Sequence, residues 1–266
     1  MKYLITILVF VVGCIPENNN IVFDQTHNNR WKIEVGEGYA PLRELLEGEG
    51  YTVTAWNDPL MWFALYSDVD ILVEAMPQIM VNNSLILNAI ESWVEDGGVL
   101  LVITDHKSFP FFVNTLLARF GSSVLNVDPI IGNGIDHCPP GITLCTKGSI
   151  SYLPAYIHPL FSTGVEYATT WAGSIISSAV SIPILTLDPN QVFTIQGSIV
   201  EVQGSETMSF IHLGEGGIMI SAEAAMWTCN NGSGAATGWC EGANPDGQFN
   251  DKFILNVFKY MSWIQH

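Results

Sequence analysis

Basic residues are scarce in this chain of 266 residues. Only nine Lys and Arg stand against 26 Asp and Glu, which gives a formal net charge of −17. Nucleic-acid binding rests on cationic contacts to phosphate, so we expect no nucleic-acid partner. The same charge disfavours docking on anionic lipid headgroups. We interpret the acidity as a source of solubility.

Several familiar catalytic motifs are also absent. The sequence contains no G-x-S-x-G elbow, no G-x-G-x-x-G between a strand and a helix, no P-loop and no H-E-x-x-H. These absences remove the common signatures of serine hydrolases, dinucleotide-binding domains, P-loop enzymes and zinc proteases. A functional site must therefore be inferred from where the fold brings polar side chains together.

The apolar run at the N-terminus is short. A single Lys precedes apolar residues 3–12, which lead into Gly13 and Cys14. A membrane-spanning helix needs about 20 apolar residues, so this run is typical of a signal peptide, and its end looks like a lipobox. We expect residues 1–13 to be a lipoprotein signal peptide and residues 14–20 a tether that begins at a lipidated Cys14. The chain would then be exported and lipid-anchored to a bacterial membrane, on its periplasmic or cell-surface face.

Cysteine is sparse, with five in the chain. Setting aside the one in the lipobox leaves two pairs that are local in sequence, namely Cys138 with Cys145 and Cys229 with Cys240. Neither pair has the C-x2-C spacing of a zinc site, so disulfides are favoured. Four cysteines allow three connectivities, of which we expect the local one. Each bridge would pin a loop and contribute about 2 to 3 kcal/mol.

Short apolar runs alternate with helical patterns over the first 120 residues. Strands are expected at 21–23, 51–55, 69–75 and 99–104, and helices at 39–47, 58–66, 84–96 and 109–120. The strand at 69–75 is interpreted as fully apolar. This alternation predicts βαβ units with right-handed crossovers, and hence an α/β fold with a doubly wound, mainly parallel sheet.

The pattern changes between Gly121 and Leu213. Short β-like runs separated by Gly, Pro and Ser predict a β-rich insertion or extension there. The α/β rhythm returns with a strand at 217–222 and a helix at 249–263. Because it returns, we expect residues 21–266 to form a single domain.

Polar side chains follow three of the expected strands. They are Asp24 and His27 after the first, Asp105 and His106 after the fourth, and Glu223 after the last. Ligands of open α/β sheets bind at the carboxyl ends of the strands, so these groups should gather at one edge. His158, in the irregular region, could fold over that edge.

Imidazoles and carboxylates in one place can bind a divalent metal or act as general acid and base. The candidate catalytic residues are Asp24, His27, Asp105, His106, Glu223 and His158, and the candidate ligands of a divalent metal are His27, His106 and Glu223. Asp after a strand also commonly caps the next helix, so Asp105 could instead be a turn and cap residue.

Several segments carry a family resemblance. They are Phe23-Asp24-Gln25-Thr26-His27-Asn28-Asn29, Gly97-Gly98-Val99-Leu100-Leu101-Val102-Ile103 leading to Asp105-His106, His158-Pro159-Leu160-Phe161 and Glu223-Ala224-Ala225-Met226. Together they resemble uncharacterised bacterial DUF4350-type proteins, which are similar to the class I glutamine amidotransferase-like fold. The resemblance implies a flavodoxin-like sheet and no assigned activity.

One turn departs from a working amidotransferase. Such an enzyme places a nucleophilic Cys on the turn after a central strand, with His and Glu to activate it. The comparable turn here is Ala75-Met76-Pro77-Gln78, which has no thiol. Glutamine hydrolysis by that mechanism is therefore not expected.

Two hypotheses of different classes remain. The first is a hydrolase-like enzyme that acts on a small polar or carbohydrate-like substrate through the candidate residues. The second is a non-catalytic binding or scaffolding lipoprotein whose amidotransferase-like fold lacks the nucleophile. A fold alone does not choose between them.

Overall fold

The computed structural model describes most of the chain between residues 20 and 264. The described ranges are 20–30, 32–34, 38–58, 68–106, 108–126, 128–132, 150–165, 168–170, 173–227 and 247–264. The expectations for the signal peptide, for Cys14, for the four remaining cysteines and for most of the helix at 58–66 lie outside these residues.

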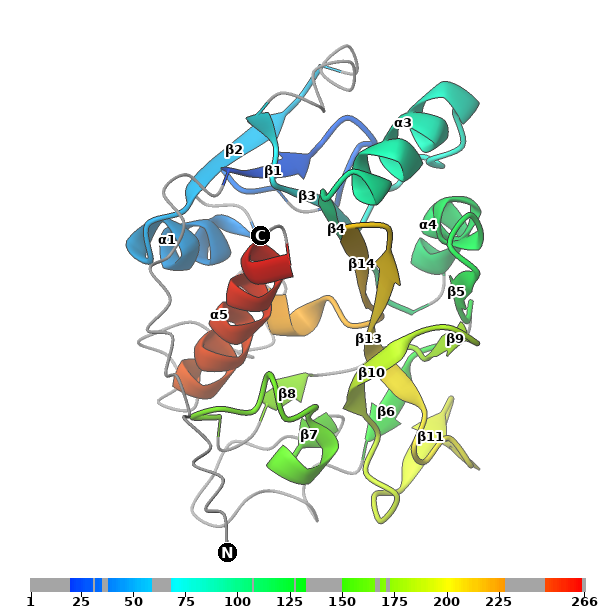
Figure 1. Cartoon of the computed structure of the whole chain (residues 1–266). Coiled ribbons are helices and arrows are strands. Elements are labelled where there is room, and N and C mark those ends of the chain that lie inside the picture. Colours follow the sequence, from blue (N-terminus) through cyan, green and yellow to red (C-terminus); the bar gives the residue numbers. More distant parts are fainter. Residues whose placement is uncertain are drawn as a thin grey trace, which may run out of the picture.

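Five neighbouring parallel strands form one side of the main sheet (Figure 1). They are β1 (Asn20–Asp24), β2 (Thr52–Trp56), β3 (Ile71–Ala75), β4 (Val99–Ile103) and β14 (Gly216–Ser221). Their order is β2-β1-β3-β4-β14, and each neighbouring pair is parallel. Sheets of the order 2-1-3-4-5 have a switch point between the first and third strands, where ligands bind. Here that point lies between β1 and β3.

Helices cover both faces of these strands (Figure 1). They are α1 (Ala40–Gly48), α3 (Ser84–Glu95), α4 (Phe109–Ala118) and α5 (Gly247–Ile264). Alternate strand residues point to opposite faces. Accordingly Val73 shares a core with Leu46 of α1 and Phe258 of α5, whereas Leu72 shares a second core with Ile90 of α3 and with α4.

The helix after β3 begins and ends where the sequence predicts. The Asn83 side chain accepts a hydrogen bond from Leu85 N at 3.0 Å, which satisfies one of the free N–H groups of the first turn. Two residues past the end, Gly97 adopts φ +112, a conformation that glycine tolerates best. The sequence allows Asn83 or Ser84 as the cap, and the structure has Asn83 there, with Gly97 just past the helix end as expected.

Residues 121–213 are rich in strands, as predicted. The strands are β5 (Ser122–Val124), β6 (Ile130–Gly132), β7 (Ile150–Tyr152), β8 (Ala168–Thr170), β9 (Ile176–Ser178), β10 (Ile182–Thr186), β11 (Phe193–Ile195), β12 (Ser198–Val200) and β13 (Glu206–Leu213). Two 3-10 helices, η2 (Pro154–Tyr156) and η3 (Ala225–Trp227), complete the described elements.

Part of the β-rich region belongs to the main sheet, which the sequence did not predict. β13 forms an antiparallel hairpin with β14 through Gly214 and Glu215, and through β13 the strands β9, β10 and β5 join a sheet of nine strands. Two smaller sheets, β12-β11-β6 and β7-β8, lie outside it. The structure is thus mixed α/β with a mostly parallel centre and an antiparallel flank.

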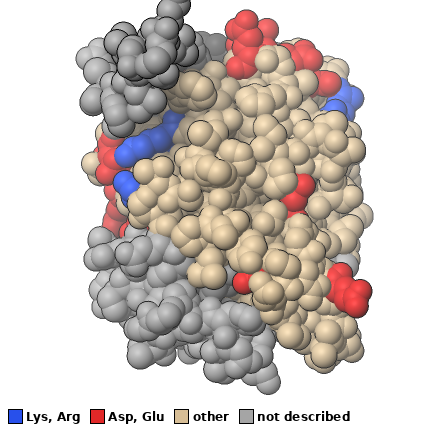
Figure 2. Space-filling view, turned by 60° about the horizontal axis from the view of Figure 1, so that its bottom comes forward, with Lys and Arg blue, Asp and Glu red and all other residues tan. Residues whose placement is uncertain are grey.

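The surface of the β-rich end carries little positive charge. Figure 2 shows the molecule with the lower end of Figure 1 turned forward. Most of the described residues on this face are uncharged (tan), and Asp and Glu (red) lie in separate groups. Within the part of the chain that the structure describes, no helix is long and apolar enough to cross a membrane.

Candidate functional site

The turns that follow β1 and β3 meet at the switch point of the sheet. The turn after β1 carries Asn28 at φ +52, and β3 is followed directly by Met76 at φ +50. Arg30 N donates to Met76 O, and Gln78 N donates to His27 O, both at 3.0 Å. These backbone hydrogen bonds fix the two turns against each other.

A buried cluster of three ionisable groups lies under these turns. His27 Nδ1 is 2.6 Å from Asp24 Oδ2 and 3.2 Å from Glu74 Oε2. The side chains of Asp24 and Glu74 are 0% and 1% exposed, and that of His27 is 11% exposed. We call Asp24, His27 and Glu74 the switch-point cluster.

Burial and mutual contact set the protonation of this cluster. Burial opposes charge on His27, but hydrogen bonds to Asp24 and Glu74 and their negative charges raise its pKa to about 10. Burial and the charge of Asp24 raise the pKa of Glu74 to about 8. Burial also opposes ionisation of Asp24, yet its contacts with His27 and Glu74 lower its pKa overall. The contacts therefore favour the charged form of the imidazole and make Asp24 the more acidic of the two carboxyl groups.

The outer oxygen of each carboxyl group in the cluster has its own donor. Thr26 N donates to Asp24 Oδ1 at 2.9 Å, and Asn29 Nδ2 donates to Glu74 Oε1 at 3.1 Å. Because these oxygens are held, the other oxygen of each group is directed at His27. Within the described residues, the switch-point cluster is the group whose possible metal-ligand atoms all lie within 4.8 Å of one another.

The turn after β4 contributes a second pair. Asp105 Oδ1 is 2.7 Å from both the backbone N and the Nδ1 of His106. The Asp105 side chain is 11% exposed and that of His106 is 28% exposed. The carboxylate therefore orients the imidazole, which reaches the surface of the protein.

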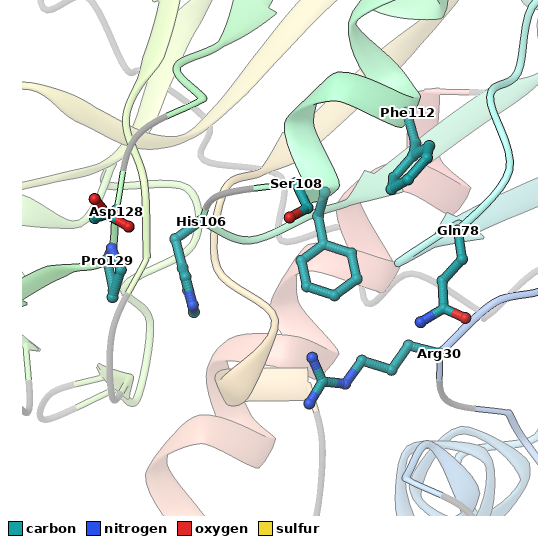
Figure 3. Close-up of a pocket in the computed structure, with 8 residues that line it drawn as sticks. Arg30, Gln78, His106, Ser108, Phe112, Asp128 and Pro129 are labelled. Atoms are coloured by element: carbon teal, nitrogen blue, oxygen red, sulfur yellow. The ribbon is translucent and has the colours of Figure 1, made fainter.

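A cavity of about 470 Å³ opens beside this pair (Figure 3). It is lined by Arg30, Gln78, His106, Ser108, Phe109, Phe112, Asp128 and Pro129. The Arg30 guanidinium carbon lies 5.5 Å from the centre of the Phe109 ring, within cation–π range. In Figure 3, His106 and Asp128 lie on one side of the cavity, and Arg30 and Gln78 lie on the other. We call this space the edge cavity.

Glu223 lies in a separate, fully buried environment. Tyr152 OH donates to its Oε1 at 3.1 Å, and Thr207 Oγ1 donates to Tyr152 OH at 2.8 Å. Burial, with a further contribution from the charge of Asp105, raises the pKa of Glu223 well above its usual range. A Cβ atom at Gly173 would lie 2.3 Å from the Glu223 carboxyl, so only glycine fits at that position.

His158 does not share contacts with the other candidates. Its backbone N donates to Ile184 O at 2.8 Å, and its Nδ1 is 3.4 Å from Leu160 N. Its ring packs edge-on against Phe161, with centroids 5.8 Å apart. None of these hydrogen bonds or ring contacts joins His158 to the five candidates that follow strands.

The structure therefore divides the candidate residues among different places. Asp24 contacts His27, Asp105 contacts His106, and Glu223 interacts with Asp105 only through charge. His106 and Glu223 are not part of the ligand group that contains His27, because one faces the edge cavity and the other is buried beside Tyr152. The structure therefore does not bring together His27, His106 and Glu223, the three metal ligands expected from the sequence.

Glu74 is the site residue that the sequence reasoning missed. The interpretation of residues 69–75 as a fully apolar strand overlooks this residue, because the sequence of β3 is Ile-Leu-Val-Glu-Ala. A carboxylate in the middle of a buried strand is rarely left unpaired, so Glu74 was the available signal. Arg30 and Asp128 of the edge cavity carried no comparable signal, because only the fold brings them together.

The fold has relatives among solved structures. The N-terminal domain of mmIFT52 is similar with a TM-score of 0.68 and 15% identity over 91% of this chain and 97% of that one. The cytoplasmic protein STM3548 from Salmonella typhimurium gives 0.56 and 14% over 91% and 98%. A putative ThuA-like protein from Bacteroides uniformis gives 0.50 and 10% over 91% and 90%. At these identities the likeness shows the fold alone. No protein-family model and no curated protein matches the sequence.

Proposed function

We propose that this chain is a ligand-binding protein whose edge cavity takes a small polar, carbohydrate-like molecule. The observation that carries the proposal is the convergence of Arg30, Gln78, His106 and Asp128 on one cavity at the carboxyl edge of the sheet. Its volume of about 470 Å³ is in the range of small-molecule sites.

The lining suits such a ligand chemically. Arg30 and Gln78 supply N–H donors, and Asp128 supplies acceptor oxygens, as hydroxyl groups require. Phe109 and Phe112 add aromatic rings, on which the apolar face of a sugar can stack. The mixture of polar groups that fix orientation and apolar walls that bury area is what ligand pockets share.

The turn after β3 favours binding over amidotransferase chemistry. We infer an amidotransferase-like ancestry for the fold, in which this turn would hold the nucleophile. Met76 stands there at φ +50 and is fully buried, and its thioether has no proton to lose and does not perform acyl transfer. In this proposal the chain keeps the strained turn at Met76 and has lost the nucleophile that an amidotransferase carries there.

The Asp105–His106 pair favours a second candidate function, acid–base hydrolysis of the same ligand. A carboxylate on Nδ1 fixes the tautomer and leaves Nε2 to act as a general base, as in catalytic dyads. His106 lines the edge cavity, so a bound molecule would meet this nitrogen. The two functions share one site and differ only in turnover.

One experiment tests both candidates. The full chain is titrated calorimetrically with mono- and disaccharides and their uronic acids, beside the variants Arg30→Gln and Arg43→Gln. We expect at least one ligand to bind the parent and the Arg43 variant equally, and the Arg30 variant at least tenfold more weakly. Arg43 is the matched control because its side chain is partly exposed on α1, where it donates a hydrogen bond to Glu47. Equal affinity in all three proteins would refute the edge cavity as the binding site.

Product analysis of the same mixtures separates binding from catalysis. If the ligand is recovered unchanged after long incubation, the binding function stands. If a product forms in the parent and not in His106→Gln, the hydrolytic function replaces it. Conversion that survives in His106→Gln excludes the Asp105–His106 pair as its cause.

We also propose that the protein is exported and anchored through a lipid on Cys14. The support is the short apolar run with the lipobox-like residues that precede this cysteine. Labelled palmitate should enter the protein in a bacterial host and be lost in Cys14→Ser. Equal labelling of both proteins would reject the anchor.

A further inference from the structure

Three donor atoms converge in the switch-point cluster. An ion with bonds of about 2.1 Å to N and O ligands holds them roughly 3.0 to 3.4 Å apart. His27 Nδ1 lies 3.2 Å from Glu74 Oε2 and 2.6 Å from Asp24 Oδ2, and all three atoms are within 4.8 Å of one another. The His27–Glu74 distance already has this spacing, whereas the His27–Asp24 distance of 2.6 Å would have to open by about 0.4 Å to reach 3.0 Å.

The surroundings of the cluster have the arrangement of a second coordination shell. Ligating carboxylates are usually hydrogen-bonded through the oxygen that does not face the ion. Here Thr26 N holds Asp24 Oδ1, and Asn29 Nδ2 holds Glu74 Oε1. The oxygens left to face His27 are those that would ligate.

A fourth polar atom beside the cluster has no hydrogen-bond partner in the described part of the chain. Asn29 is 5% exposed, and within the described part of the chain its Oδ1 has no hydrogen-bond partner. Buried polar atoms are nearly always satisfied by protein, water or an ion. This oxygen belongs to the amide that contacts Glu74, so it lies at the border of the cluster.

We propose that Asp24, His27 and Glu74 bind one divalent transition cation, such as Zn²⁺ or Mn²⁺. One imidazole and two carboxylates suit these ions, whereas Ca²⁺ and Mg²⁺ prefer sets made only of oxygen. The ion would sit at the switch point, where the carboxyl ends of β1 and β3 meet.

The site has a structural consequence for the edge cavity. The backbone of His27 accepts from Gln78 N, and Arg30 follows the cluster within the same turn. A bound ion would therefore order the two turns that supply Gln78 and Arg30 to the cavity. The proposal of an ion site rests on the cluster alone and holds whichever ligand the cavity takes.

Metal stoichiometry tests the proposal directly. The full chain, His27→Gln, Glu74→Gln and the control His212→Gln are dialysed against Zn²⁺ or Mn²⁺ and analysed for bound metal. His212 is exposed on β13, away from the cluster. We expect the parent and the control to hold one equivalent more than either cluster variant, with an affinity loss on the order of 100-fold or more in the variants. Equal metal content in all four proteins would overturn the proposal.

A measurement on the parent alone covers the case in which the variants fail to fold. Co²⁺ replaces Zn²⁺ in most N/O sites and reports its ligands by absorption. Visible ligand-field bands without an intense thiolate charge-transfer band support the cluster. A spectrum dominated by thiolate bands would assign the metal to cysteines and overturn the proposal, as would the absence of any bound Co²⁺.

Discussion

Because Glu223 is neutral in the folded protein, we can predict how this residue makes folding stability depend on pH. In the folded protein burial keeps this carboxyl protonated, with its pKa well above the usual value of 4.5. In the unfolded chain it ionises near its ordinary pKa. As pH rises above about 4.5, ionisation therefore stabilises the unfolded chain, and folding stability is lost until the pH passes the folded pKa.

The size of the effect follows from linkage. A single group that is neutral in the folded state and ionised in the unfolded state contributes about 1.4 kcal/mol per pH unit. Glu223→Gln mimics the neutral carboxyl, keeps an oxygen for Tyr152 OH to bond and removes the titration. The stability of this variant relative to the parent should therefore rise with pH from pH 5 upward, by at most about 1.4 kcal/mol per pH unit for as long as the folded carboxyl stays neutral.

Urea unfolding of the parent and variant at half-unit steps of pH measures this difference. Other titrating groups contribute equally to both proteins and cancel. Glu215→Gln, on the exposed turn between β13 and β14, is the matched control and should show a flat difference. A flat difference for Glu223→Gln as well would mean that Glu223 titrates alike in both states, and the argument from burial would be refuted.

Two backbone positions and one cap give further predictions. Gly98→Ala should lower the free energy of unfolding by about 1–3 kcal/mol, because the new Cβ would lie 2.1 Å from the Trp93 ring. Gly48→Ala should instead leave stability unchanged or raise it by up to about 1 kcal/mol, since it is helical and meets nothing within 4 Å. Asn83→Ala should cost about 1 kcal/mol by removing the hydrogen bond to Leu85 N, and thermal and urea unfolding check all three. A Gly98 variant as stable as the Gly48 variant, or an Asn83 variant as stable as the parent, would contradict the geometry.

The parallel half of the fold was predictable because its signals are local. The runs that became β3 and β4 are short, buried and flanked by helical patterns, and Asn83 and Gly97 mark the limits of α3. The antiparallel flank was not placed, because β13 joins the sheet through a hairpin with β14. Nothing in the separate sequences of β9 and β5 indicates that they would extend the same sheet.

The candidate site was predictable only where its contacts are short in sequence. Asp24 and His27 are three residues apart, and Asp105 and His106 are neighbours, so the ends of strands were enough to find them. Glu74 joins the cluster from 47 residues away and was hidden in a strand interpreted as apolar. Asp128 lines the cavity from the loop after β5, and no local sequence pattern predicts this position.

The two proposals are linked by the turn that they share, and linkage gives a last prediction. If an ion in the switch-point cluster orders the turn that carries Arg30, it should tighten ligand binding in the edge cavity by some factor. Binding free energies are reciprocal, so the ligand must then tighten ion binding by the same factor. Calorimetry of each partner with and without the other measures both factors.

Couplings of this kind usually amount to 5- to 150-fold. Factors above one would show that the cluster and the cavity are coupled, and the hydrogen bond between Gln78 and His27 and the backbone that leads to Arg30 are the route we propose. A factor of one in both directions would mean that the turns are already rigid without the ion, because the buried contacts of Asp24, His27 and Glu74 hold them unaided. In that case the cluster would be a structural support of the switch point, and the specificity of the cavity would depend on its own lining alone.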